Sequence, residues 1–167
     1  SHLNFAVFPM KAFSSLCSSL DNLECLEISH INIDGSQIIE AACADAPKIR
    51  KLILKGMKFE NEWKIQKTFN LPVTLSLLNI SETHFAHSSF ANFLQNITAE
   101  LTKVPFFLIC RSLKFSESAL LEFQSNFDPS KCQSNLLEFD MSDNMIPKLA
   151  FGPLFTFIQT QERLRNL

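Results

Sequence analysis

Apolar residues recur along the chain at unequal steps that fit neither a strand nor a helix alone. In the stretch NLLEFDMSDNMI, residues 135–146, they fall at Leu136, Phe139, Met141 and Ile146, with Asn144 between the last two. Strict alternation would place apolar residues at every second position, and a helix would place them at continuing steps of three and four. The steps here are three from Leu136 to Phe139, two to Met141, three to Asn144 and two to Ile146. The useful test is whether this spacing recurs.

The same spacing does recur. The template is apolar-x-x-apolar-x-apolar-x-x-(Asn/Thr/Cys)-x-apolar, and its copies begin 26 to 31 residues apart, at Leu23, Ile49, Leu75, Pro105, Leu136 and Leu164. Self-similarity at such a period indicates a repeat array, in which each unit packs on its neighbours. The copy at Leu164 is incomplete, and residues 1–10 resemble the tail of another unit. We therefore expect about five full repeats with partial units at both ends.

Each unit is expected to contain a strand, a turn and a helix. The strands are predicted over 25–29, 51–55, 77–81, 107–111 and 138–142, with a further one near 3–6. Apolar residues at helical steps predict helices within 36–49, 87–101 and 116–127, and a helix that begins at Pro153. Asp34 or Ser36 can cap the first of these helices. From the template we also expect ten side chains to be nearly fully buried: Leu26, Ile28, Leu52, Leu54, Leu78, Ile80, Leu108, Cys110, Phe139 and Met141.

The spacing resembles that of the leucine-rich repeat family across essentially the whole chain. Only Asn144 matches the ladder asparagine of the family. The other copies carry Ile31, Met57, Thr83 and Leu113 at that position. The threonine can still hydrogen-bond the turn, whereas the apolar residues must be held by packing. Repeats of this length with helices are similar to the ribonuclease-inhibitor-like branch.

This resemblance implies an α/β fold, a leucine-rich repeat solenoid that forms a horseshoe segment. A parallel sheet would line its concave side, and helices would cover its convex side. Residues 1–167 would form a single leucine-rich repeat domain. Because neither end carries a polar cap, we expect the domain to be a segment of a longer array.

The composition is that of one ordinary domain, and it disfavours several classes of function. The chain has 167 residues, of which 46% are hydrophobic, enough for a sizeable core. Lys and Arg total 15 against 17 Asp and Glu, so the charge gives no case for nucleic-acid binding. The longest apolar run, VPFFLIC at 104–110, is far shorter than the ~20 residues of a membrane span. Three Gly cannot build a Gly-rich phosphate loop.

The five cysteines favour a reduced, intracellular protein. Their number is odd, none forms a Cys-x-x-Cys pair, and three lie in apolar-periodic stretches where a thiol acts as a small hydrophobe. Glycosylation sequons begin at Asn79 and Asn96, but so short a motif is expected by chance in a chain this rich in Asn, Ser and Thr. With no basic start followed by an apolar run, we expect a cytoplasmic location.

Candidate chemistry is sparse. His84 and His87 lie three residues apart, yet no Cys, Asp or Glu pair joins them at metal spacing, so solvated turn residues are the preferred interpretation. Cys110 falls at a core position, which disfavours a Cys–His nucleophile pair. Cys25 faces outward beside acidic residues that would raise its pKa rather than activate it. We expect no catalytic activity, no metal and no cofactor.

The outward positions of the predicted strands offer a candidate binding surface. Its middle is apolar, basic residues surround the middle, and acidic residues lie at both ends. An apolar centre with a charged surround is a common composition of protein interfaces. The alternative is a surface that merely favours strands. We expect another protein to bind here through Ile53, Lys55, Leu77, Phe107, Ile109 and Arg111.

Two classes of function remain open. LLNISETHF and LLEFDMSDN are similar to repeats of the actin-capping-protein linker family, CARMIL, which implies a non-catalytic scaffold in the regulation of actin assembly. The stretch INIDGSQIIEAACADAPKIRKLIL is similar to repeats of GTPase-activating proteins for nuclear-transport GTPases. Leucine-rich repeats also serve as substrate receptors in ubiquitin ligases and as sensors in nucleotide-binding immune receptors. We prefer the protein-binding scaffold; the alternative is a recognition or regulatory segment of an enzyme system.

Overall fold

The main feature of the fold is a parallel sheet covered by helices. The computed structural model describes residues 9–59, 71–86, 89–100, 105–116, 119, 123, 127–128, 132, 135–146 and 148–167. In this part of the chain, the main sheet has five parallel strands in the order β1-β2-β4-β6-β8. They are β1 (Cys25–Ser29), β2 (Lys51–Lys55), β4 (Leu77–Asn79), β6 (Phe106–Ile109) and β8 (Leu136–Asp140). The predicted α/β class with a parallel sheet is therefore confirmed.

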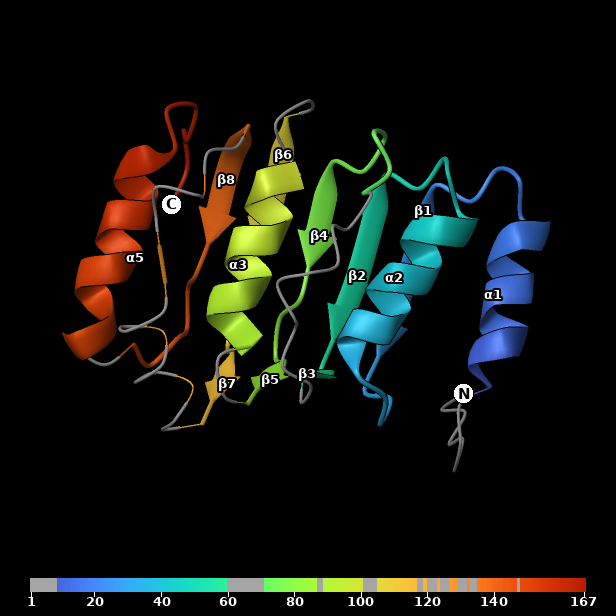
Figure 1. Ribbon diagram of the computed structural model, residues 1–167, viewed down its shortest axis with the longest axis horizontal. Coiled ribbons are helices and arrows are strands. Elements are labelled where there is room, and N and C mark those ends of the chain that lie inside the picture. Colours follow the sequence, from blue (N-terminus) through green and yellow to red (C-terminus); the bar gives the residue numbers. More distant parts are fainter. Residues whose placement is uncertain are drawn as a thin grey trace.

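A second, smaller sheet and four helices complete the described part. The small sheet is also parallel, in the order β3-β5-β7. Its strands are β3 (Lys58–Phe59), β5 (His84–Phe85) and β7 (Lys114–Phe115). The helices are α1 (Met10–Ser19), α2 (Gly35–Asp45), α3 (Ser89–Glu100) and α5 (Lys148–Thr160). Figure 1 shows α2 and α3 in front of the main sheet, and the small strands below the ends of the main strands.

The predicted strands over 25–29 and 51–55 are confirmed at those bounds. Three predicted strands extend too far at their C-terminal ends: 77–81, 107–111 and 138–142. The strands β4, β6 and β8 each end two residues earlier. Moreover, β6 and β8 begin earlier than predicted, at Phe106 and Leu136, because both side chains are buried in the core. The strand predicted near 3–6 lies outside the described residues.

The core lies between the main sheet and the helices. Eight of the ten side chains predicted to be nearly fully buried have exposed fractions of 0–8%: Ile28, Leu52, Leu54, Leu78, Ile80, Leu108, Cys110 and Phe139. The prediction was wrong for Leu26 and Met141, which are only partly buried. In the described ranges β1 and β8 are the outer strands of the main sheet; Leu26 lies on the first, and Met141 directly follows the second.

The helix boundaries are explained by caps and by packing. Asp34 caps α2, since its Oδ1 accepts a hydrogen bond from the Ser36 amide at 2.9 Å. The prediction that a helix begins at Pro153 was wrong, because α5 begins at Lys148 and encloses the proline. The turn before Pro153 packs Ala150 into the core, and this burial favours a longer helix. Of the helix predicted within 116–127, the structure describes three inward side chains: Ala119, Phe123 and Phe127.

The same left-handed turn follows each main strand. Its central residue has a φ of 51–62° and directly precedes the predicted ladder position of the unit. The five residues are His30, Gly56, Glu82, Ser112 and Asp143. Only one of them is glycine, the residue that adopts this conformation without strain. A left-handed residue therefore occurs at the same position of each of the five complete template copies.

Candidate functional site

The face of the main sheet that points away from the core carries two rows of side chains. Each row crosses all five strands, because paired residues of parallel strands lie side by side. The first row contains Cys25, Lys51, Leu77, Phe107 and Glu138. The second row contains Glu27, Ile53, Asn79, Ile109 and Asp140. We call these two rows the sheet face.

The predicted apolar residues all lie on the sheet face and are half-buried. Leu77 pairs directly with Phe107, so these two side chains are neighbours in the first row. Ile53 and Ile109 each pair with Asn79, which separates them in the second row. The sheet face therefore has an apolar centre that is interrupted by one amide side chain.

Asn79 and Asp140 form the same local hydrogen-bonded turn. The Oδ1 of Asn79 accepts hydrogen bonds from the amide and hydroxyl of Ser81, at 3.0 and 2.7 Å. The Oδ1 of Asp140 accepts from the same two groups of Ser142, also at 3.0 and 2.7 Å. These are Asx turns, in which a side chain takes over the role of a backbone acceptor. They orient the two polar side chains of the second row.

Arg111 and Asp140 form an ion pair between neighbouring units. The guanidinium Nε donates to Asp140 Oδ2 at 2.6 Å, and a terminal nitrogen lies 2.5 Å from the same oxygen. The hydrogen bond from Arg111 lowers the pKa of the Asp140 carboxyl to about 2, although partial burial opposes this shift. Arg111 was expected to be a basic residue that surrounds the apolar centre. Instead, its charge is largely compensated by Asp140.

This ion pair and the Asx turns were not predicted from the sequence. Both Arg111 and Asp140 were placed on the correct face, but their contact depends on a long side chain that reaches across to the next strand. The Asx turns did have a sequence signal, since an Asp or Asn precedes a Ser by two residues at Asp34, Asn79 and Asp140. At the first of these positions the same geometry caps α2.

Lys55 lies at the end of β2 and is half-buried, next to the apolar centre. Lys51 is exposed in the first row, where it pairs with Leu77. In the described part of the chain, these two lysines bring positive charge to the same side of the centre. The acidic residues Glu27 and Glu138 lie toward opposite ends of the rows, as the sequence predicts.

Burial keeps two of the cysteine thiols protonated. All five cysteines are free, and Cys17, Cys110 and Cys132 are buried. Burial raises the pKa of Cys110 well above its usual value and the pKa of Cys43 to about 12, so both thiols stay protonated at neutral pH. His87 of the candidate histidine pair lies outside the described residues. Among those that are described, no group of three His, Cys, Asp or Glu side chains could hold a metal ion.

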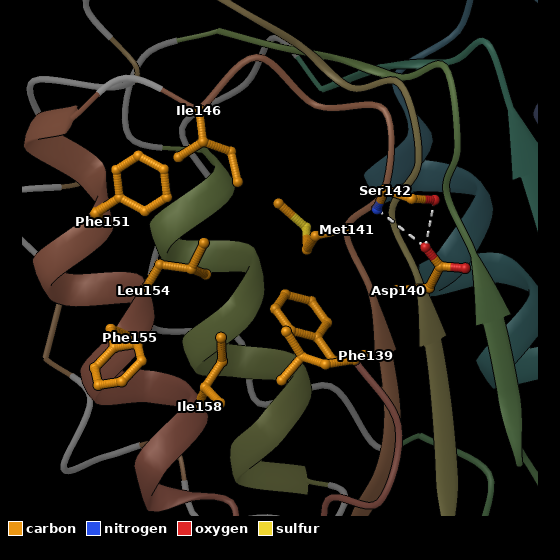
Figure 2. Close-up of a pocket in the computed structure, with 10 residues that line it drawn as sticks. Phe139, Asp140, Met141, Ser142, Ile146, Phe151, Leu154, Phe155 and Ile158 are labelled. Atoms are coloured by element: carbon orange, nitrogen blue, oxygen red, sulfur yellow. Dashed lines mark hydrogen bonds between the residues drawn. The ribbon is translucent and has the colours of Figure 1, made fainter.

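A second surface is an apolar groove between β8 and α5 (Figure 2). Its volume is about 410 Å³. From α5, Phe151, Leu154, Phe155 and Ile158 face it, and from the other side Phe139 and Met141. Leu167 also lines the groove and is 75% exposed.

The last residues of the chain begin to pair with the outer edge of β8. The amides of Arg165 and Asn166 both donate to the carbonyl of Leu137, at 2.9 and 3.3 Å. The start of β2 uses the same pattern, where the amides of Arg50 and Lys51 both donate to the carbonyl of Glu24. The incomplete sixth template copy therefore starts along the same path as the second one.

Comparison with known proteins does not add a functional assignment. A scan against protein-family models finds no match, and a search of curated proteins finds no similar sequence. Among the described residues, no helix combines the length and the apolar character needed to cross a bilayer.

Proposed function

We propose that this chain is a segment of a leucine-rich repeat solenoid that binds another protein through the sheet face, as a non-catalytic scaffold. The observation that carries the proposal is the apolar centre of that face. Leu77 and Phe107 lie side by side on adjacent strands, with Ile53 and Ile109 in the next row. Four half-buried apolar side chains on the open face of a sheet are typical of a contact surface.

The recurrence of the backbone supports the solenoid part of the proposal. Two parallel sheets, one left-handed residue in each template copy and helices beside the main sheet are expected of stacked strand–turn–helix units. Asn144 also supports it, because its side chain donates to the Cys110 carbonyl of the preceding unit at 2.7 Å and accepts from the Leu113 amide at 2.7 Å. This is the role expected of a ladder asparagine.

The polar surroundings of the centre favour binding over chemistry. Asp140 is held by Arg111 and Ser142, and its lowered pKa makes it a poor proton acceptor at neutral pH. Asn79 is held by Ser81. Because these polar side chains are already held in place, they can orient a partner while losing little conformational entropy on binding. The lysines at positions 51 and 55 would attract an acidic rim on that partner.

The test is capture of partners from cell extract by the wild-type chain and by the variants Phe107→Ser and Ile109→Ser. Each captured protein is then purified, and its direct binding is measured. We expect either substitution to weaken binding about tenfold or more, as for the loss of a central apolar anchor. Lys55→Glu should chiefly slow association and change its dependence on salt.

Val73→Ser is the matched control, because Val73 is 66% exposed and does not belong to the sheet face. Thermal unfolding is followed for every variant. Binding that survives Phe107→Ser unchanged would show that the sheet face is not the site. A Phe107→Ser chain that loses its fold would show instead that this side chain belongs to the core.

A further inference from the structure

The first row of the sheet face carries two opposite charges that flank an apolar pair. From β1 onward, the row contains Cys25, Lys51, Leu77, Phe107 and Glu138. A bridge pairs Glu138 with Asn166, so the row continues into the sixth template copy with an amide side chain. Each of the two charged residues therefore has an uncharged neighbour on both sides along the row.

Neither of these two charges has an ion-pair partner. In the part of the chain that the structure describes, neither Lys51 nor Glu138 forms a salt bridge. Glu138 accepts a long hydrogen bond of 3.3 Å from the side chain of Asn166. Glu27, on β1, lies diagonally across from Lys51, at the distance of about 7–8 Å that is usual for such neighbours. In contrast, Arg111 and Asp140 of the same face already form an ion pair with each other.

The spacing of the row matches an extended chain that crosses the strands. Adjacent strands lie about 4.8 Å apart, so Glu138 lies about 14 Å from Lys51, and the midpoint falls between Leu77 and Phe107 at about 7 Å. In an extended chain, alternate side chains point the same way, and residues two and four apart are separated by about 7 and 13 Å. Residues on one face of a helix are about 10 Å apart at seven residues and about 16 Å at eleven. An extended chain therefore fits the row better than a helix does.

We propose that the partner of the sheet face contributes an extended segment with an acidic, an apolar and a basic side chain at every second position. The acidic side chain pairs with Lys51, and the basic one pairs with Glu138. The apolar one packs between Leu77 and Phe107. This assignment rests on the proposed function and adds the side-chain pattern of the partner. A segment with the charges in the opposite order fits in the reverse direction, so the row selects one charge of each sign.

The probes are three synthetic peptides with blocked ends. The mixed peptide is Thr-Glu-Thr-Phe-Thr-Lys-Thr, and the other two carry either two Glu or two Lys at the charged positions. NMR titration of the whole chain at low salt measures dissociation constants into the millimolar range. It also locates the site, through the backbone amides of Leu77 and Phe107. We expect the mixed peptide to bind about two- to fivefold more tightly than either of the others, as for the gain of one exposed charge pair.

Reversal of one charge in the row should change this preference. Lys51→Glu makes both charged positions of the row acidic, so this variant should favour the peptide with two Lys. Glu138→Lys makes both positions basic and should favour the peptide with two Glu. Lys148→Glu is the matched control, because Lys148 is exposed and belongs to α5 rather than to the sheet face. It should keep the preference of the wild type.

Equal binding of the three peptides, with shifts at Leu77 and Phe107, would overturn the charge pattern and leave the sheet face as a binding surface. An unchanged preference in both reversed variants would also overturn it. If no peptide shifts these amides at millimolar concentration, the extended segment is refuted. The proposed function is judged separately, by the direct binding of a captured protein to the wild type and to Phe107→Ser. If Lys51→Glu loses its circular dichroism signal, Lys51→Gln replaces it and should no longer discriminate against the peptide with two Lys.

Discussion

Asn144 offers the sharpest test of how the units are joined. Its Nδ2 donates to the carbonyls of Cys110, Met141 and Ser142, at 2.7, 2.7 and 3.2 Å, and its Oδ1 accepts from the Leu113 amide at 2.7 Å. Replacement by alanine removes all four hydrogen bonds. Cys110 and Leu113 are buried, so their backbone groups would lose a partner that water does not easily replace. An unsatisfied buried group costs about 1–3 kcal/mol. We therefore expect Asn144→Ala to lower the free energy of unfolding by roughly 3–5 kcal/mol.

The equivalent position of another unit provides a matched comparison. Thr83 is fully buried, but its hydroxyl makes two long hydrogen bonds, both of 3.4 Å, to the carbonyls of Leu54 and Ser81. Hydrogen bonds of this length are weak. We expect Thr83→Val to cost about 1 kcal/mol or less. Asn144→Thr imitates the Thr83 unit, and its effect should fall between the other two.

The assay is urea unfolding followed by far-ultraviolet circular dichroism, with the midpoint and the slope compared between variants. An unchanged slope means that the variants lose stability rather than cooperativity. A loss for Asn144→Ala that is no greater than the loss for Thr83→Val would refute the reasoning. Packing alone would then hold the turn, as it does at Met57.

Three further predictions concern the ion pair, the turn and the core. The folded-state pKa of Asp140 is depressed to about 2, so its charge contributes stability above the unfolded pKa of about 4. The difference in melting temperature between wild type and Asp140→Asn should shrink as pH falls from about 4 to about 2. Gly56→Ala should lower the free energy of unfolding by about 1–3 kcal/mol, since φ of Gly56 is +61° and the new Cβ would meet the His30 ring. The control is Gly152→Ala, in a helix and with open space around the new Cβ, which should be neutral or slightly stabilising. Leu54→Ala should cost about 2–5 kcal/mol in the same urea assay, and an unchanged midpoint would contradict its core position.

The template predicted the strands well where no polar side chain competes with the backbone. It succeeded fully for β1 and β2, which carry Glu27 and Ile53 at the fifth template position. It ran two residues too far in β4 and β8, which end at Asn79 and Asp140. There the side chain accepts the hydrogen bond of the serine amide two residues on, and the chain turns out of the ladder. Strand β6 lies between these two, so it has no ladder partners beyond Ile109.

The sequence predicts which residues lie on the sheet face, but it does not predict the ion pair that forms there. Alternation along each strand is a local property, so the outward residues follow from the sequence once the strands are known. Direct neighbours such as Leu77 and Phe107 follow from their equivalent positions in successive template copies. The ion pair of Arg111 with Asp140 does not follow, because a long side chain can take several directions and the sequence does not select one of them.

The left-handed turns could not be predicted from the conformational preferences of single residues. Four of the five turn residues are not glycine, and a non-glycine residue pays about 1 kcal/mol or more for this conformation. In each of the first four units, however, the amide of the turn residue donates to a carbonyl of the next unit, at 2.8–3.3 Å. These acceptors are the carbonyls of Lys55, Ser81, Arg111 and Ser142. In these four units the hydrogen bond to the neighbouring unit helps to stabilise the left-handed conformation. Asp143 adopts the same conformation in the fifth unit, so local preference contributes as well.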